Sequence, residues 1–163
     1  MKGFELVFFR HGIAADSAPD SSRPLTEDGI RKTYSSAEGL KKMAIPFDRV
    51  FTSPWLRASQ TAKILSEVLM IPAPEEMPEL AGDHTAAELL EALHNCQSRC
   101  FLLVGHQPLL GDAVATLLGA RGRCEIDLRK SGACSIHLDG LPPKKSAVLN
   151  WLLTSKQLRA VGK

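Results

Sequence analysis

The sequence has little excess charge of either sign and no long apolar run. Its 20 Lys and Arg side chains nearly balance 18 Asp and Glu, which leaves a formal net charge of +2. This is too small to favour nucleic acid or an anionic membrane as a partner. Met1-Lys2-Gly3 leads straight into strand-like sequence rather than a signal peptide, and no apolar run approaches the roughly 20 residues that cross a bilayer. We therefore expect a cytoplasmic protein.

Cysteine is scarce, and its spacing favours neither a redox motif nor a metal site. No C-x-x-C pair occurs among the four cysteines, which are Cys96, Cys100, Cys124 and Cys134. Reduced thiols are the expected state in a reducing compartment. A zinc site that combines His84 or His94 with Cys96 and Cys100 is an alternative, although the usual spacing of metal ligands is missing. We expect neither a metal nor a cofactor.

Several nucleotide-binding and hydrolase motifs are also missing. There is no G-x-x-x-x-G-K-[ST] loop, no G-x-G-x-x-G after a strand and no G-x-S-x-G. With 163 residues, of which 44% are hydrophobic and 23% charged, the chain has the composition of an ordinary globular protein with one sizeable core. We predict a single domain that spans residues 1–163.

Three apolar runs are predicted to be strands, and each of them ends at a polar turn that precedes a helical pattern. The strands and the residues that follow them are 4–9 with Arg10, His11 and Gly12; 49–52 with Ser53, Pro54 and Arg57; and 100–104 with Gly105, His106 and Gln107. In parallel β–loop–α units such turns lie at the same edge of the sheet. Two arginines and two histidines would converge there, next to the N-termini of two helices.

Phosphate is the ligand that this combination of side chains fits. The guanidinium group of Arg meets two phosphate oxygens at once and stays charged at physiological pH. A neutral histidine can attack a phosphoryl group through one ring nitrogen while a hydrogen bond holds the other. The strand ends therefore predict a site for phosphate chemistry.

The rest of the pattern predicts an α/β fold, a three-layer α/β/α sandwich with a mostly parallel central sheet and an antiparallel edge. Thr26 is the expected N-cap of a helix that ends before Pro46, and Ser53 that of a helix that ends before Pro72. Further helices are expected at 85–93 and at 110–118, where Gly119 stops the helix. The other predicted strands are 77–80, 125–128, 133–138 and 147–153, and the Lys- and Arg-containing tail after them is interpreted as solvated charge.

Four ordered blocks of sequence carry a family resemblance. They are Phe9-Arg10-His11-Gly12; Pro24-Leu25-Thr26 with Gly29; Ser53-Pro54-x-x-Arg57-Ala58-x-Gln60-Thr61-Ala62; and Gly105-His106-x-Pro108. In this order they resemble the signatures of the histidine phosphatase (phosphoglycerate mutase-like) superfamily, and they span residues 8 to 108. The short chain, Arg23-Pro24-Leu25-Thr26 and the G-H-x-P form are most similar to the SixA-type phosphohistidine phosphatases.

This resemblance implies a phosphatase that forms a covalent phosphohistidine on His11. Arg10, Arg57 and His106 would hold the phosphoryl oxygens, and Gly12 and Gln107 would add to substrate binding; water would then release phosphate. Many relatives place a glutamate acid after the third strand, and Glu79 in Pro78-Glu79-Leu80 roughly matches that position. Asp16, or no acid at all, is the alternative.

Whether a general acid is needed depends on the leaving group of the substrate. An imidazole that leaves a phosphohistidine can carry its own proton, whereas an alkoxide needs one from an acid. The short segment 73–85 also leaves little chain for a lid over the site. We therefore expect a phosphohistidine-bearing signalling or transport protein as partner, and a phosphate or sulfate ion as a ligand of the site. The alternatives are a small-molecule phosphomonoesterase or mutase, and a phosphate-recognition module without turnover.

Overall fold

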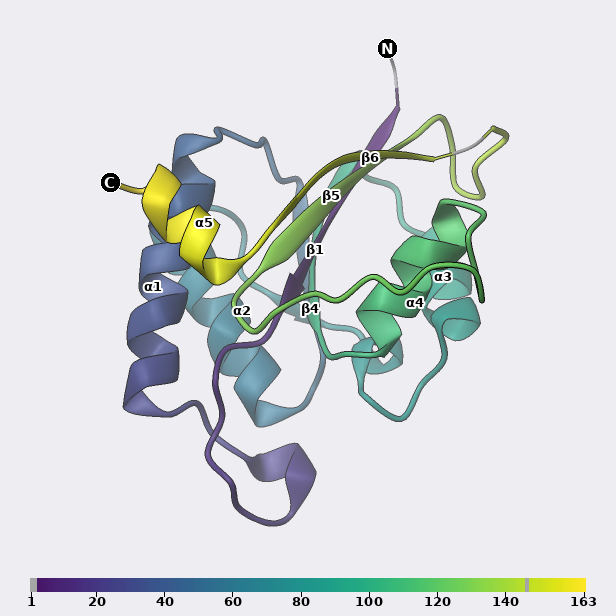
Figure 1. Ribbon diagram of the computed structural model, residues 1–163. Helices are drawn as coiled ribbons and strands as arrows, with labels where there is room; N and C mark the ends of the chain where they lie inside the picture. Colours follow the sequence, from purple (N-terminus) through teal and green to yellow (C-terminus); the bar gives the residue numbers. More distant parts are fainter. Residues whose placement is uncertain (1–2, 146) are drawn as a thin grey trace.

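One mixed sheet runs through the computed structural model, which describes residues 3–145 and 147–163 (Figure 1). Met1, Lys2 and Ser146 lie outside the described residues. The prediction that no signal peptide is present falls partly on Met1 and Lys2. The described strands lie in the order β3-β2-β4-β1-β5-β6. Their bounds are β1 (Phe4–Arg10), β2 (Arg49–Thr52), β3 (Glu75–Glu76), β4 (Cys100–Gly105), β5 (Ala133–Leu138) and β6 (Val148–Leu153).

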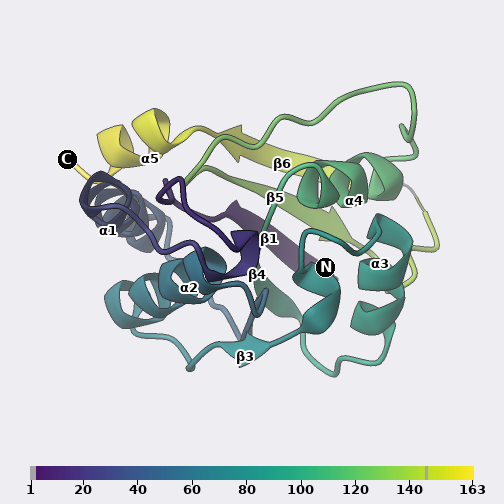
Figure 2. The ribbon, with the colours of Figure 1, turned by 90° about the horizontal axis from the view of Figure 1, so that it is seen from below.

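Helices cover both faces of this sheet (Figure 2). They are α1 (Glu27–Lys42), α2 (Leu56–Leu69), α3 (Ala86–His94), α4 (Leu109–Leu117) and α5 (Ser155–Val161), with short 3₁₀ turns η1 (Asp20–Ser22) and η2 (Pro78–Leu80). None of the helices in the described ranges is long and apolar enough to cross a membrane. The first four strands pair in parallel and β5 and β6 pair antiparallel, so the predicted sandwich with an antiparallel edge is confirmed.

The sheet is the middle layer because its central strand is apolar on both faces. Val7 and Phe9 of β1 pack with the cluster under α1, α2 and α5, while Leu6 and Phe8 pack with the cluster under α3 and α4. All four side chains are fully buried. A strand buried on both sides loses the usual alternation of polar and apolar residues, which is how the run from Phe4 to Phe9 reads.

The predicted convergence of three strand ends is confirmed. β2, β4 and β1 are parallel neighbours, so the turns after them meet at the edge that faces the viewer in Figure 2. The backbone N–H of His11 donates to the Gly105 carbonyl (3.1 Å), and that of Ser53 to the Val104 carbonyl (2.9 Å). These bonds hold the turns after β1 and β2 against the end of β4.

Two of the predicted strands are wrong. Residues 125–128 form no strand; instead the Leu128 carbonyl accepts from the Arg10 guanidinium and the Ile126 carbonyl from the Gln107 amide. Residues 77–80 were predicted as an edge strand. The strand that pairs with β2 is instead β3, which lies just before them at Glu75–Glu76, and Pro78 begins the 3₁₀ turn η2. Two carbonyls of 125–128 accept from side chains, and the Leu80 N–H bonds within the turn, to the Met77 carbonyl; apolar patterning cannot reveal either arrangement.

Two helix assignments also change. α2 begins at Leu56 with Trp55 as N-cap, because the Ser53 hydroxyl accepts a hydrogen bond from the Trp55 N–H rather than capping the helix itself. The charged tail contains α5, which buries Leu158 against the cluster under α1. Its start carries a capping box between Thr154 and Gln157, a signal that the tail's charges obscured. Gly119 does stop α4, with φ of +68°.

Candidate active site

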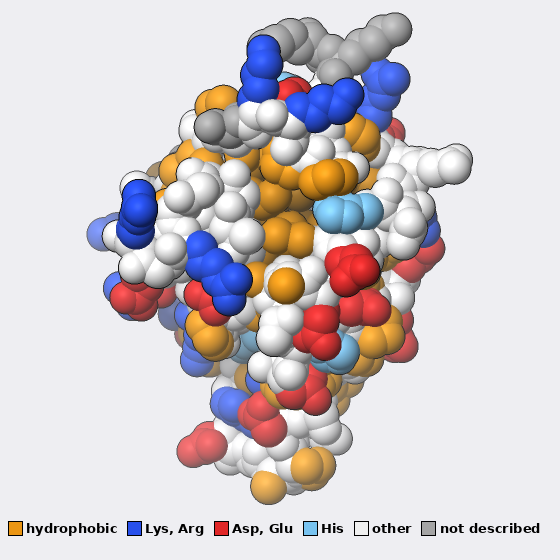
Figure 3. Space-filling view, turned by 90° about the vertical axis from the view of Figure 1, so that its right-hand side faces the viewer, with side chains coloured by type: hydrophobic (Ala, Val, Ile, Leu, Met, Phe, Trp, Pro, Cys, Tyr) orange, Lys and Arg blue, Asp and Glu red, His pale blue; other side chains and the backbone are white. Residues whose placement is uncertain are grey.

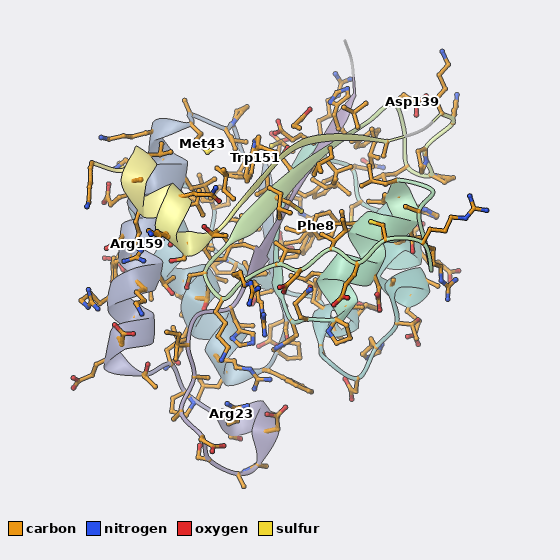
Figure 4. All side chains as sticks on the ribbon, viewed as in Figure 1. Phe8, Arg23, Met43, Asp139, Trp151 and Arg159 are labelled. Carbon is orange, nitrogen blue, oxygen red and sulfur yellow. The ribbon has the colours of Figure 1, made fainter. Side chains whose placement is uncertain are left out.

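A cavity of about 290 Å³ opens where the three strand ends meet, and it gathers most of the predicted site residues. Arg10 and His11 come from the end of β1, Arg57 from the first turn of α2, and His106 and Gln107 from the turn after β4. Asp20, Arg23, Trp55, Gly82 and Lys130 complete the lining. Figure 4 places Arg23 near this edge and Asp139 at the opposite end of the molecule.

The imidazole of His11 is held as one neutral tautomer. Its Nδ1 lies 2.7 Å from the Gly12 carbonyl, which can only accept, so Nδ1 carries the hydrogen. Its Nε2 lies 3.2 Å from Nε–H of Arg57, which can only donate. Because Nδ1 carries the hydrogen, Nε2 has a lone pair, and this lone pair accepts the hydrogen bond from Arg57. His11 is 6% exposed, so this orientation is fixed by its surroundings.

The turn that carries His11 is clamped from three sides. The Gly12 N–H donates to the Thr61 hydroxyl (3.0 Å), and the Ser131 N–H reaches the carbonyls of both Arg10 and His11. A Cβ on Gly12 would lie 2.5 Å from Oγ1 of Thr33, so the turn has room only for glycine. Gly12 was predicted to bind substrate; in the structure it is outside the cavity lining, and its backbone orients His11.

Arg57 is a buried cation whose side-chain hydrogen bonds go to other residues of the cavity lining. It is 5% exposed. Besides the bond to His11, its Nη1 donates to the Asp20 carbonyl (2.6 Å) and its Nη2 to the Asp20 carboxylate (3.2 Å). Arg10 is anchored through Nη1 to the Leu128 carbonyl (2.9 Å), while its buried Nε has no partner among the described residues. Both guanidinium groups can therefore offer N–H groups to an anion.

His106 stands beside His11 with one nitrogen unpartnered. The two ring centroids are 5.0 Å apart, and the Trp55 ring lies 4.7 Å away on another side. Nε2 of His106 makes a 2.8 Å hydrogen bond with the Ser53 hydroxyl. Nδ1 is buried and has no partner in the part of the chain that the structure describes. A buried polar atom without a partner is costly, and an anion in the cavity would supply one.

Both histidines are neutral at physiological pH. Burial lowers the pKa of His11 to about 3, and the nearby cations Arg57 and Arg10 act in the same direction. Burial likewise lowers the pKa of His106 to about 3, with His11 and Arg57 contributing. With both imidazoles uncharged, the described lining still holds four Arg and Lys side chains against one carboxylate, so the potential in the cavity is positive and favours an anion.

This neutrality predicts that the fold loses stability in mild acid. Unfolding returns each imidazole from a pKa of about 3 to about 6.5, so between these values the unfolded state binds protons that the folded state does not. Each histidine is expected to remove about 2 kcal/mol of unfolding free energy between about pH 7 and pH 5. Urea unfolding of wild type, His11→Asn and His106→Asn measures this. Each variant should lose about that much of the pH dependence; variants that keep all of it would contradict neutral histidines.

The carboxylate of this cavity is Asp20, which the sequence did not single out. Arg23 and, to a smaller extent, Arg57 hold the pKa of the exposed Asp20 carboxyl below its usual value, so it is ionised at neutral pH. The predicted acid, Glu79, is outside the lining and borders a separate depression of about 250 Å³ with His84 and Glu88. Asp16, the alternative, is exposed in the loop before η1 and is also outside the lining.

Gln107 and the zinc alternative can also be placed. The Gln107 amide donates to the Ile126 carbonyl (2.8 Å) and accepts from the Gly111 N–H (2.8 Å), so its side chain secures the turn that carries His106. The described residues contain no cluster of three His, Cys, Asp or Glu that could hold a metal ion. What the cavity offers is an array of N–H donors for a tetrahedral oxyanion beside an imidazole lone pair.

Comparison with known proteins leads to the same chemistry. The family model described as histidine phosphatase superfamily (branch 1) matches residues 6–84. Phosphohistidine phosphatase SixA of Escherichia coli is 34% identical over 160 residues, which cover 95% of this chain and 96% of the relative. An uncharacterised protein of Picosynechococcus is 40% identical over 140 residues, which cover 82% of this chain and 84% of that protein.

A solved structure extends the likeness to the fold. The protein histidine phosphatase SixA complexed with tungstate superposes with a TM-score of 0.85 at 32% identity, and the match covers 95% of this chain and 99% of that one. The chain belongs to the histidine phosphatase superfamily. It is a phosphatase, hence a hydrolase, of the SixA-like type within that superfamily.

Proposed function

We propose that this phosphatase removes the phosphoryl group from a phosphohistidine of a protein substrate, and that it does so through a covalent phosphohistidine on His11. The observation that carries the proposal is the neutral His11 imidazole, whose Nε2 lone pair faces a cavity walled by guanidinium groups. A neutral imidazole whose lone pair accepts only an exchangeable hydrogen bond, and a phosphoryl-binding array in the same cavity, are the two requirements of this mechanism.

In the first step Nε2 of His11 attacks phosphorus. The bond between phosphorus and the substrate's nitrogen breaks, and the electron pair leaves with the substrate imidazole, which is neutral because its other ring nitrogen carries a proton. In the second step water attacks the phosphohistidine and loses one proton to the solvent, His11 leaves with its electron pair as a neutral imidazole, and hydrogen phosphate departs. The Gly12 carbonyl supports both steps because it keeps Nδ1 protonated and Nε2 available.

Arg10, Arg57 and His106 hold the phosphoryl oxygens in this proposal. Arg57 exchanges its bond to His11 for one to a phosphoryl oxygen as the substrate arrives, which exposes the Nε2 lone pair for attack. In the tautomer that we propose for His106, Nε2 accepts from the Ser53 hydroxyl and the unpartnered Nδ1 carries the hydrogen that it offers to the anion. Preorganised donors of this kind dominate catalysis of phosphoryl transfer. Phosphate and sulfate are the ions that we expect to bind here.

The leaving-group side favours phosphohistidine over an alkyl phosphate. Asp20 is ionised by its contacts with Arg23 and Arg57, so it carries no proton to give to an alkoxide. An imidazole needs no such donor. The relatives named SixA are phosphohistidine phosphatases, and tungstate in one of them is a tetrahedral oxyanion shaped like phosphate. A phosphorylated signalling or transport protein is therefore the partner that we propose. In this proposal residues 1–163 act as one domain, and the cytoplasm stays our prediction for the location of this phosphatase.

A substrate comparison tests this function. The wild type is assayed on a histidine-phosphorylated phosphotransfer domain, on p-nitrophenyl phosphate and on sugar phosphates, with kcat/KM as the readout. We expect the phosphoprotein to be preferred by at least about a hundredfold, the scale of a missing proton donor. A preference for sugar phosphates would instead indicate a small-molecule phosphatase or mutase, and turnover of none of them would indicate a phosphate-recognition module.

A further inference from the structure

A second cavity lies next to the active site and is lined by cations. It has a volume of about 340 Å³ and shares Arg10 and Lys130 with the active-site cavity. Lys32 of α1, Arg129 of the loop before β5 and Arg159 of α5 complete its charged lining, and no carboxylate among the described residues lines it.

The positive lining continues along α1 and α5. A third cavity of about 660 Å³ shares Arg159 with the second. Its charged lining adds Arg31, Lys156 and Lys163, and Glu38 is the carboxylate among its described lining residues. We call these seven cations the basic track: Arg31, Lys32, Arg129, Lys130, Lys156, Arg159 and Lys163. Figure 4 places Arg159 on the α5 side of the molecule, well above Arg23.

Ion pairs within the chain neutralise only some of the cations of the basic track, so the others can pair with a partner. Asp28 pairs with both Arg31 and Lys32, the latter at 2.7 Å, and Asp127 pairs with Arg129 at 3.0 Å. Lys130 and Lys156 form no ion pair with any described residue. The chain as a whole has a net charge of only +2, so the track concentrates positive charge on one side of the active site.

The other side of the active site carries the opposite charge. Glu79, Glu88 and Glu91 border the depression beside α3, and acidic side chains gather on the face that α3 and α4 form (Figure 3). A substrate that approaches His11 therefore meets positive potential towards α1 and α5 and negative potential towards α3. Such a gradient orients a charged partner before contact.

We propose that the basic track docks an acidic surface of the phosphoprotein substrate beside its phosphohistidine; this rests on the proposed function. The track runs through two cavities beyond the one that would hold the phosphoryl group, so it is more extensive than a single phosphate requires. Most of the residues that line these two cavities are Arg, Lys or Ser, whose polar groups can bind hydrated carboxylates. Docking there sets the approach of the phosphohistidine to His11 and raises the association rate without taking part in the chemistry.

Charge reversal in the track tests the proposal. The variant Lys156→Glu/Arg159→Glu is compared with wild type on two probes: a phosphotransfer domain with acidic residues around its phosphohistidine, and phosphoimidazole, which has the same P–N bond and no acidic surface. At low salt we expect kcat/KM for the domain to fall at least about tenfold and that for phosphoimidazole to change less than about twofold. At about 0.5 M salt the difference should largely vanish, because exposed charges are then screened.

Matched controls keep the result interpretable. Lys144→Glu reverses a charge in the turn after Asp139, at the end of the molecule away from Arg23, and should leave both rates unchanged. The neutral variant Lys156→Gln/Arg159→Gln, checked by its Tm, should give a smaller loss of the same kind. Unchanged hydrolysis of the domain, or equal losses on both probes, would overturn the docking role. A wild type that ignores the phosphorylated domain but cleaves phosphoimidazole would instead refute the proposed protein substrate and the docking with it.

Discussion

The His11→Ala variant is expected to lose turnover by at least about 10⁴-fold while it still binds phosphate. Without Nε2 no covalent intermediate can form, and removing a nucleophile costs a factor of this order or more. Binding should persist because Arg10, Arg57 and His106 remain, and Arg57 is released from its bond to the lost imidazole. Steady-state kinetics with a phosphohistidine protein and calorimetric titration with inorganic phosphate measure the two effects separately.

The control for this variant is His84→Ala. His84 is partly exposed and lies 3.6 Å from Glu88, outside the cavity lining, so its loss should change kcat/KM by less than about twofold. If His11→Ala retained more than about a tenth of wild-type turnover, His11 would not be the nucleophile.

The Arg57→Ala variant is expected to lower kcat/KM by at least about a hundredfold. A well-placed donor to the transition state contributes about 2.7–4 kcal/mol. Arg57 has the geometry of such a donor, since its Nε lies 3.2 Å from the attacking nitrogen and its Nη atoms are fixed by Asp20. Arg57→Lys should recover little of the loss, because an ammonium group cannot contact His11 and Asp20 as a planar fork does.

Arg49→Ala provides the matched comparison. Arg49 begins β2, at the end of that strand away from the cavity, and pairs with Glu75 at 2.6 Å. Its removal is expected to leave kcat/KM within about twofold of wild type, as for most surface ion pairs. A loss below threefold in Arg57→Ala would show that this guanidinium does not face the reacting phosphoryl group.

The central part of the fold could be predicted from the sequence because its signals are local and strong. β1 and β4 consist mainly of apolar residues and lead directly into Arg10-His11 and Gly105-His106, and the helical periodicity after each strand places the turns at one edge of a parallel sheet. α5 was missed because a seven-residue helix that buries only Leu158 has almost no apolar period. Its capping box, Thr154 with Gln157, was the available signal.

The site residues at strand ends were predictable for the same reason, whereas those supplied by loops were not. Asp20 reaches Arg57 through the 3₁₀ turn η1, and the conformation of that loop depends on contacts with α2 that no local pattern encodes. Lys130 enters the cavity from the loop before β5. The segment Glu125-Ile126-Asp127-Leu128 looked like a strand because its short sequence run is strand-like, yet its carbonyls accept hydrogen bonds from the side chains of Arg10 and Gln107.

Trapping the covalent phosphohistidine on His11 is the most direct test of the proposed mechanism. Wild type is incubated with labelled phosphoramidate, quenched in alkali and mapped by mass spectrometry under alkaline conditions. We expect an alkali-stable, acid-labile phosphoryl group on His11 that disappears in His11→Ala. A wild type that turns over without any such label, or a label that persists on another residue in His11→Ala, would contradict it.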